Sequence, residues 1–174
     1  KMGFAASHAY GKSGEKLVLN LLKKNGYEPS LNEVKEDRSY YDIIVNLSPK
    51  KKTFIECKFD MMCCQTGNVA IEYYNPKSDK PSGINITKAH IYSYTILDMG
   101  NPTVWFANVA KLKDFVKNVK PLKTITVGGD KNASLYLYRY EVILDAVFKQ
   151  MENLPDVETF QKTFKSLLGT KNKE

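Results

Sequence analysis

Residues 41–59, with the sequence YDIIVNLSPKKKTFIECKF, decide the fold of this chain. Two stretches rich in β-branched and aromatic residues, 41–47 and 52–59, flank a turn at 48–51 that contains proline and lysine. This pattern predicts an antiparallel β-hairpin. The hairpin also carries charged residues within its apolar strands, and those residues are the first indication of a function.

The second strand of the hairpin places an acid and a base side by side. Because side chains alternate along a strand, Phe54, Glu56 and Lys58 share one face, while Ile55 and Cys57 lie on the other. An unpaired carboxylate among apolar side chains costs several kcal/mol. Glu56 therefore needs a partner, a proton or a metal ion.

Two further acids fall where charge is costly. Asp42 begins the first strand, and Glu15 lies on the shoulder of the apolar face of a helix predicted over Ser13–Asn25. Asp42 and Glu56, on neighbouring strands, are placed to converge on one hard cation, which for carboxylate and water ligands means Mg²⁺ or Mn²⁺. Lys58 points into the same space, where it is placed to bind a phosphate, stabilise the transition state, or orient and deprotonate the attacking water.

The rest of the chain predicts an α/β fold with a mixed sheet. In chain order, the pattern after the hairpin predicts a strand over 69–74, a helix from near Thr87 through Ile96, a strand over 103–109, a helix over 111–119, a hairpin of 123–127 with 134–140, and helices over 142–151 and 157–168. The element order is αβββαβα followed by ββαα. Residues 1–174 are expected to form a single domain, with a core over 13–109 and a C-terminal β-hairpin and helical extension over 110–174.

These residues together resemble the PD-(D/E)XK nuclease superfamily, which has the restriction-endonuclease-like fold. The resemblance rests on Asp42 in its strand, on the Glu56-Cys57-Lys58 tripeptide, on Glu15 in the preceding helix and on the αβββαβ order. Within the superfamily, the chain is most similar to phage and archaeal nucleases of the junction-resolvase and recombination type. Tyr41 stands where the family's motif often has proline.

The resemblance implies a metal-dependent nuclease that hydrolyses phosphodiester bonds of DNA by metal-activated water attack, with an endonuclease favoured over an exonuclease. The catalytic residues would be Glu15, Asp42, Glu56 and Lys58. Asp42, Glu56 and the backbone carbonyl of Cys57 would bind Mg²⁺ or Mn²⁺, with Glu15 and Glu72 as further candidate ligands.

The charge balance points to a polyanionic partner. The chain has 26 Lys and Arg against 19 Asp and Glu, a formal net charge of +7, which suits nucleic acid or an anionic membrane surface. With the acids described above, DNA is the expected partner and RNA the alternative. Candidate contacts with the phosphate backbone lie in and around the loop that follows strand 69–74, at Lys77, Lys80, Ser82 and Lys88.

Other classes of protein are not supported by the sequence. No apolar run approaches the roughly 20 residues that cross a bilayer, so no membrane association is expected. The first residues lack the apolar segment of a secretory signal, and the three cysteines, Cys57, Cys63 and Cys64, suit a reducing cytoplasm. A homodimer is compatible with the sequence.

The same residues allow a structural interpretation and a second function. In the structural interpretation, Asp42 caps a turn, Glu56 and Lys58 form an ion pair on a solvated face, and Glu15 is a first-turn acid of its helix. The tyrosines near the site either stack on unpaired bases or fill the edge of the core. The second function is a non-catalytic nucleic-acid-binding module that retains a nuclease fold.

Overall fold

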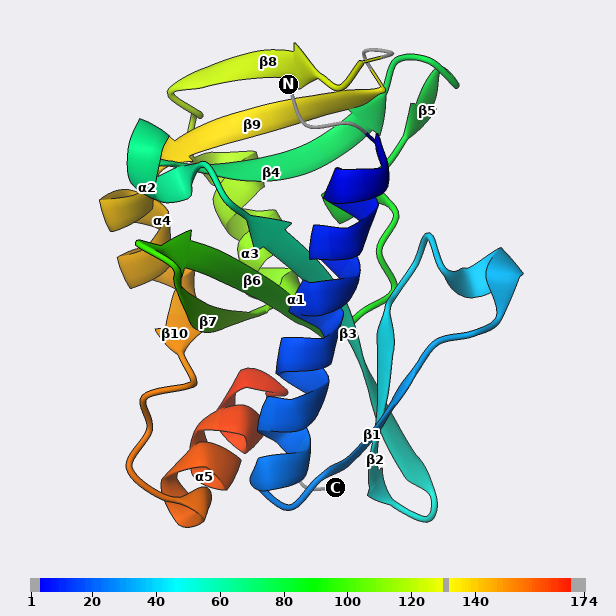
Figure 1. The fold of residues 1–174 in the computed structure, drawn as a ribbon, viewed down its shortest axis with the longest axis vertical. Helices are drawn as coiled ribbons and strands as arrows, with labels where there is room; N and C mark the ends of the chain where they lie inside the picture. Colours follow the sequence, from blue (N-terminus) through cyan, green and yellow to red (C-terminus); the bar gives the residue numbers. More distant parts are fainter. Residues whose placement is uncertain (1–3, 130–131, 170–174) are drawn as a thin grey trace.

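The structure is a computed structural model that describes residues 4–129 and 132–169, with the side chains of 4–10 left out of the description. Within those residues it contains two β-sheets and five α-helices (Figure 1). The chain is therefore a mixed α/β protein. None of the described helices is long and apolar enough to cross a membrane.

The larger sheet has six strands in the order β1-β2-β3-β6-β7-β10. Its strands are β1 (Glu28–Leu31), β2 (Ile43–Ser48), β3 (Lys51–Asp60), β6 (Ile91–Asp98), β7 (Asn101–Asn108) and β10 (Phe148–Gln150). Neighbouring strands are antiparallel except β3 and β6, which are parallel. The hairpin of β2 and β3 and the mixed sheet are both as the sequence predicted.

The second sheet has four strands in the order β5-β4-β9-β8 and lies at the top of Figure 1. Its strands are β4 (Asn68–Asn75), β5 (Lys80–Pro81), β8 (Lys123–Val127) and β9 (Ala133–Arg139). The predicted αβββαβ order counted 69–74 as the third core strand, and this prediction is wrong. The third antiparallel strand beside the hairpin is β1, whose four residues are too short and too exposed to give an apolar pattern.

The helices lie on both sides of the larger sheet. They are α1 (Phe4–Lys24), α2 (Cys63–Thr66), α3 (Val109–Asn118), α4 (Tyr140–Val147) and α5 (Val157–Leu167), with single 3₁₀ turns η1 (Lys35–Asp37) and η2 (Gly83–Asn85). Helix α1 begins well before the predicted start at Ser13 and ends as predicted before Gly26. There the amide of Tyr27 donates to the carbonyl of Leu22 at 3.1 Å, which closes the helix.

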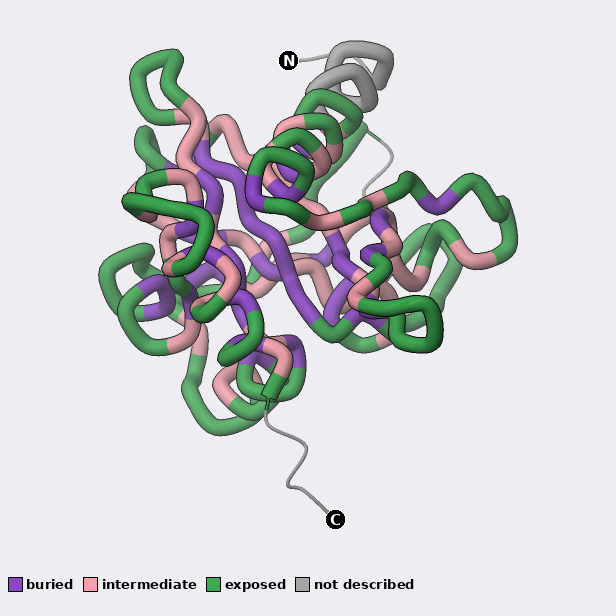
Figure 2. Tube along the Cα trace, turned by 90° about the horizontal axis from the view of Figure 1, so that it is seen from below, coloured by how far each residue is buried: buried purple, intermediate pink, exposed green. Residues whose placement is uncertain are grey.

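The larger sheet separates two hydrophobic cores. Val18 of α1 and Phe164 of α5 pack with Ile55 on one side of it. On the other side Tyr92 packs with the second sheet and with helices α2, α3 and α4. In Figure 2 the buried residues accordingly run through the strands in the middle of the molecule, while helices and turns expose their outer sides.

Residues 91–98 form strand β6, so the helix predicted from near Thr87 is wrong. All six residues from Ile91 to Ile96 are buried, because β6 lies between β3 and β7 and has a core on each face. A strand buried on both faces loses the polar alternation that identifies a strand, and its apolar spacing then resembles that of a helix. The β-branched and aromatic residues of this segment are the local feature that favours a strand.

The predicted helix over 142–151 is also shorter than expected. Helix α4 ends at Val147, and residues 148–150 form β10, which pairs with β7 at the edge of the larger sheet. Phe148 is buried in the core beneath this edge, which favours extended backbone over another helical turn. The other predicted strands and helices are confirmed within a few residues.

Candidate functional site

A cavity of about 290 Å³ gathers most of the residues predicted to be functional. Strand β3, the start of β2, helix α1, strand β4 and the η2 loop each contribute side chains to it. The predicted residues that line it are Glu15, Asp42, Glu56, Lys58, Glu72 and Ser82, and Cys57 lines it as well.

Glu56 and Lys58 lie side by side on one face of β3, as the alternation of the strand predicted. Lys58 Nζ lies 3.3 Å from Glu56 Oε1. Glu56 is only 5% exposed, and its second oxygen, Oε2, is buried with no hydrogen-bond partner in the described part of the chain. The ion pair of the structural interpretation therefore forms, but its acid is buried rather than solvated.

Asp42 lies just before β2 and is held against β3 by two hydrogen bonds. Its amide donates to the carbonyl of Ile55 at 2.9 Å, and its Oδ2 accepts the amide of Cys57 at 2.7 Å. The carboxylate thus takes the place of a strand carbonyl instead of capping a turn. Because residues 55 and 57 present their backbone groups to the same side of β3, the carbonyl of Cys57 lies on the edge where Asp42 sits.

Glu15 reaches the cavity because α1 approaches β3 closely at the preceding residue. A Cβ atom added at Gly14 would lie 3.0 Å from Cβ of Phe59, so a larger residue would push the helix away. Glu15 is half-buried beside Asp42. The position of Glu15 on the shoulder of the buried face is as the sequence predicted.

The three acids resist ionisation in this cavity. Burial raises the pKa of Glu56 to about 7; Lys58 opposes this shift and Asp42 adds to it. Burial also raises the pKa of Asp42, against the opposing effect of the Cys57 amide, and it raises the pKa of Glu15, with Asp42 adding to the shift. Burial is the largest cause of each shift, and a bound cation would favour the ionised form of all three acids.

Lys58 remains protonated at neutral pH. Burial alone would lower its pKa, but Glu56, Tyr92 and Glu72 raise it, and the net shift is above the ordinary value. A group that holds its proton this firmly acts as a fixed positive charge. A raised pKa is the opposite of what the removal of a proton from water requires, a role that the sequence had left open beside phosphate binding.

Three buried polar atoms around the site have no hydrogen-bond partner among the described residues. They are Glu56 Oε2, the hydroxyl of Ser82 and the hydroxyl of Tyr92. A buried polar atom left unpaired costs roughly 1–3 kcal/mol, a cost that a water, an ion or a ligand bound beside these three atoms would remove. Tyr92 lies opposite Glu56 in the ladder of β3 and β6. This position could not be predicted, because the sequence analysis expected a helix where β6 lies.

The η2 loop holds Ser82 in the cavity. The amide of Ser82 donates to the carbonyl of Tyr73 at 3.1 Å. Gly83 has φ 52°, and a Cβ atom there would lie 2.2 Å from the carbonyl oxygen of Glu72, so only glycine allows this packing. Gly83, which the sequence placed with Ser82 in a loop that could contact a phosphate, lines the cavity, and so does Arg38, which the sequence had not assigned to the site. No local pattern distinguishes Arg38 from other exposed basic residues.

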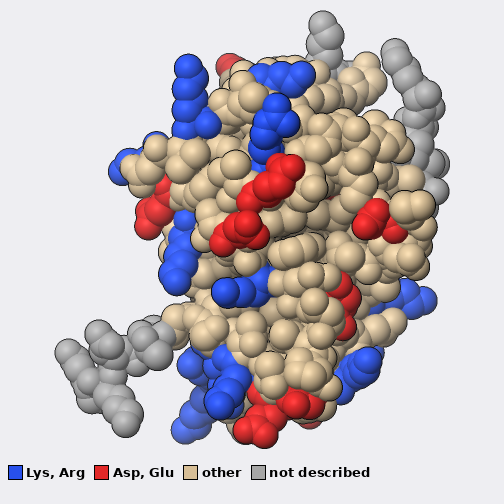
Figure 3. Space-filling model, turned by 90° about the vertical axis from the view of Figure 1, so that its left-hand side faces the viewer, with Lys and Arg blue, Asp and Glu red and all other residues tan. Residues whose placement is uncertain are grey.

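The predicted lysines do not line the cavity, although Lys80 and Lys88 flank the η2 loop in the chain. Lys77, Lys80 and Lys88 are exposed. Lys88 Nζ lies 4.0 Å from the centre of the Tyr40 ring. The backbone amide of Lys88 donates to the carbonyl of Tyr40. On a different face of the molecule, shown in Figure 3, basic and acidic side chains are interspersed, so that face offers no continuous basic surface.

The donor groups of the site suit a hard divalent cation. In the described ranges 4–129 and 132–169, no group of three or more His, Cys, Asp or Glu side chains is arranged so that it could hold a metal ion. Two carboxylates and one carbonyl, completed by water, are nevertheless the oxygen ligands that Mg²⁺ and Mn²⁺ accept. The unpartnered Glu56 Oε2 supports this fit, and Asp42, Glu56 and the Cys57 carbonyl are the groups that would hold the ion.

Cys57, Cys63 and most of the described tyrosines pack in or against the hydrophobic cores, whereas Cys64 is exposed. The three cysteines are free thiols, and burial followed by the charge of Asp42 raises the pKa of Cys57 well above its ordinary value. Tyr41 stacks on Phe54 with ring centres 4.3 Å apart, and Tyr73 stacks on Tyr136 at 3.9 Å. These rings pack against the core rather than standing free in solvent.

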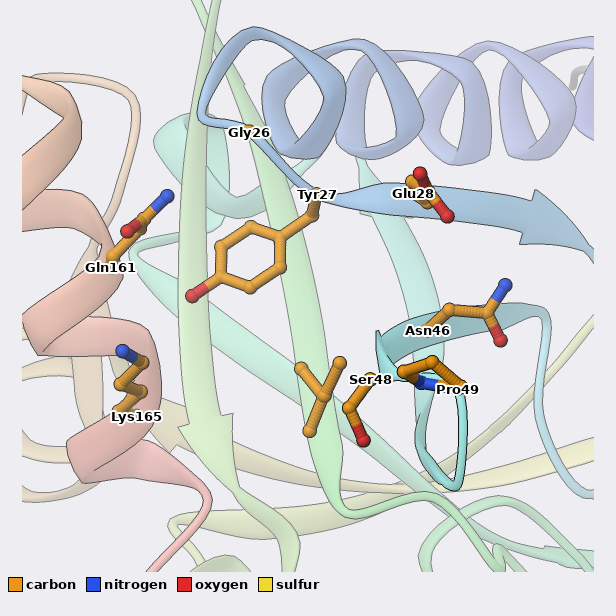
Figure 4. Close-up of a pocket in the computed structure, with 9 residues that line it drawn as sticks. Gly26, Tyr27, Glu28, Asn46, Ser48, Pro49, Gln161 and Lys165 are labelled. Carbon is orange, nitrogen blue, oxygen red and sulfur yellow. The ribbon is translucent and has the colours of Figure 1, made fainter.

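A separate polar cavity of about 630 Å³ lies at the far end of α1 (Figure 4). Tyr27, Asn46 and Lys165 are among its lining residues. This polar cavity contains none of the predicted site residues.

Comparisons of the chain with protein-family models, with curated proteins and with solved structures find no match. The residues and their geometry are therefore the basis for a functional assignment.

Proposed function

We propose that this protein is a metal-dependent nuclease that hydrolyses phosphodiester bonds of DNA. The observation that carries the proposal is the position of Asp42 and Glu56, two acids with raised pKa values, beside the protonated Lys58 in one cavity. Such an arrangement combines oxygen ligands for a cation with a fixed positive charge for a phosphate.

The element order supports assignment to the PD-(D/E)XK superfamily. Helix α1 is followed by three antiparallel strands, β1, β2 and β3, and then by β6 parallel to β3. Asp42 precedes the second of these strands, and Glu56 and Lys58 lie on the third. The chain departs from the expected order in the crossover from β3 to β6, which contains α2, β4, β5 and η2 in place of one long helix.

Each residue then has a defined task. Asp42, Glu56 and the Cys57 carbonyl bind Mg²⁺ or Mn²⁺, which when bound supplies a water of lowered pKa and positive charge near the phosphate. Lys58 donates hydrogen bonds to a non-bridging phosphate oxygen and stabilises the charge that develops there. Glu15 and Glu72, on opposite sides of β3, are the further acids that hold water or a second cation.

The direct test measures cleavage of linear, single-stranded, flapped and four-way-junction DNA with Mg²⁺, Mn²⁺ or EDTA. We expect metal-dependent cleavage that falls by at least about a thousandfold in Glu56→Gln and in Lys58→Ala, because each substitution removes stabilisation of the transition state. The matched controls are Glu28→Gln and Lys52→Ala, which remove exposed charges of the same sheet. Full activity in either site variant would refute the proposal.

The ion pair favours a second candidate function. Because Lys58 lies 3.3 Å from Glu56, the two charges compensate each other without a cation, as a non-catalytic nucleic-acid-binding module would require. Under that function the wild-type protein binds DNA and cleaves none of the substrates with either metal. DNA binding measured in EDTA beside the cleavage assay separates the two functions.

A further inference from the structure

A second cavity, of about 720 Å³, adjoins the candidate site. It lies between the larger sheet and the second sheet, and Lys58 and Glu72 line both cavities. Tyr92 and Tyr94 of β6 form part of one wall, and Ile125 of β8 forms part of the wall opposite. A ligand that reaches Lys58 therefore has a partly open space directly beside it.

The walls of this cavity are largely apolar, and most of their polar atoms are already paired. The hydroxyl of Tyr94 accepts the amide of Ala70 at 3.1 Å and donates to Asp60. Asp60 Oδ1 also accepts the amides of Met62 and Cys63, at 2.7 and 2.9 Å. The Asp60 carboxylate is therefore committed to the fold and is not available to a ligand.

Few polar or charged groups of the cavity lining remain available to a ligand, and they are of different chemical kinds. The hydroxyl of Tyr92 and Oδ1 of Asn68 are buried, belong to residues that line the cavity, and have no hydrogen-bond partner in the described part of the chain. Lys58 and Lys123 add two positive charges to the lining, and Glu72 adds a carboxylate. An apolar space with a hydroxyl, an amide oxygen and flanking cations suits a flat ring system attached to anionic groups.

We propose that this cavity binds one unpaired base of the DNA strand that is cut. The inference rests on the proposed function, since Lys58 would hold the scissile phosphate and the neighbouring cavity would then receive a base of the same strand. The aromatic rings and aliphatic side chains contact the faces of the base. The Tyr92 hydroxyl bonds its polar edge, and Lys123 is placed for an adjacent phosphate.

This pocket defines the substrate class. In a continuous duplex each base is stacked and paired, and extruding it costs a few kcal/mol. A base in a single strand or in a flap enters the pocket without that cost. The protein therefore binds and cuts unpaired strands in preference to a continuous duplex of the same sequence.

The test fills the cavity and measures DNA binding in EDTA. Ile125→Trp places a larger side chain on the β8 wall, and Thr124→Trp is the matched control because Thr124 is exposed on the same strand and does not line the cavity. A fluorescein-labelled single strand and its duplex are titrated with each folded variant. Stacking of one base contributes about 1–3 kcal/mol, so we expect Ile125→Trp to weaken single-strand binding by about tenfold or more.

The duplex and the control variant complete the experiment. We expect duplex binding to change less than about twofold in Ile125→Trp, and both ligands to bind Thr124→Trp as they bind the wild type. Leu135→Phe, on the same wall, is the second variant if Ile125→Trp does not fold. Equal binding of single strand and duplex by the wild type, or unchanged single-strand binding in both filled variants, would overturn the inference.

Binding in EDTA also separates this inference from the proposed function. If the wild type prefers single strands and loses that preference in the filled variants, the pocket exists whether or not the protein cleaves DNA. If the protein cleaves with Mg²⁺ but the filled variants keep the wild-type preference, the nuclease proposal stands and the base pocket is wrong.

Discussion

At the scale of single residues, the alternation of β3 was sufficient to predict that Glu56 and Lys58 lie side by side. Glu56 and Lys58 stand out because charged residues within an apolar strand have few stable environments, and the structure places both in one cavity with Asp42. The position of Tyr92 opposite Glu56 and the place of Arg38 in the cavity could not be predicted in the same way. Their importance depends on which distant elements they face, and a tyrosine in an apolar stretch or an arginine in an exposed loop is ordinary by itself.

The unpaired hydroxyl of Tyr92 has a consequence for stability. Tyr92→Phe removes a buried polar atom that has no partner, so we expect the free energy of unfolding to rise by about 1 kcal/mol. Tyr138→Phe is the control, because the Tyr138 hydroxyl donates to the carbonyl of Val119 at 2.9 Å, and its removal should lower the same quantity by about 1 kcal/mol. Urea unfolding checks both variants. Equal destabilisation by the two substitutions would show that the Tyr92 hydroxyl is paired in solution.

The raised pKa of Glu56 predicts how stability depends on pH in EDTA. Burial raises this pKa from 4.5 to about 7, so the folded state holds the proton more tightly than the unfolded state. Stability is then greatest at low pH on account of this group and falls as the pH rises from about 4.5 to about 7. Glu56→Gln should reduce the slope, with Glu28→Gln as the control, in urea unfolding at several pH values. An unchanged slope in Glu56→Gln would contradict the assignment.

At the scale of elements, the strands that have one apolar face were predictable and those in special positions were not. β2 and β3 show turn residues between two apolar stretches, so their pairing followed from the sequence. β6 is buried on both faces, and β1 and β10 are short strands at the sheet edges, so none of the three shows the alternation that marks a strand. The order of strands in the sheets depends on contacts between segments far apart in the chain, which local periodicity does not contain.

The η2 loop is predicted to depend on its glycine. Gly83→Ala adds a Cβ atom that would lie 2.2 Å from the carbonyl oxygen of Glu72, at a residue with φ 52°. We expect a loss of about 1–3 kcal/mol in the free energy of unfolding, and a larger relative loss of cleavage because Ser82 moves with the loop. Gly11→Ala is the control. This helical position has no neighbouring atom within 4 Å, so the added methyl should leave stability equal or up to about 1 kcal/mol higher. Comparable losses in the two variants would contradict the loop packing.

At the scale of the whole molecule, the fold gathers the acids of the candidate site while it leaves most lysines on the surface. The larger sheet brings acids from α1, β3 and the segment before β2 into one cavity, whereas Lys77, Lys80 and Lys88 are exposed. Under the proposed function, exposed lysines would attract an anionic strand and the carboxylates would hold a cation. The composition predicted a polyanionic partner, but only the fold decides which lysines lie near the cavity.

Lys80 and Lys88 give a prediction for DNA binding at different salt concentrations. Lys80 and Lys88 flank the η2 loop beside the cavity, whereas Lys23 and Lys24 end α1 at the far end of that helix from Glu15. Each lysine that contacts a phosphate of a single strand contributes about 0.7 to the magnitude of the slope of log K against log salt. We expect the double variant Lys80→Ala/Lys88→Ala to lower that magnitude by about 1.4, measured by fluorescence titration of single-stranded DNA in EDTA at rising NaCl. Lys23→Ala/Lys24→Ala removes the same charge from the remote end and should leave the slope close to that of the wild type. Equal effects of the two double variants would mean that binding follows net charge alone, and would remove the rim of the cavity from the DNA-binding surface.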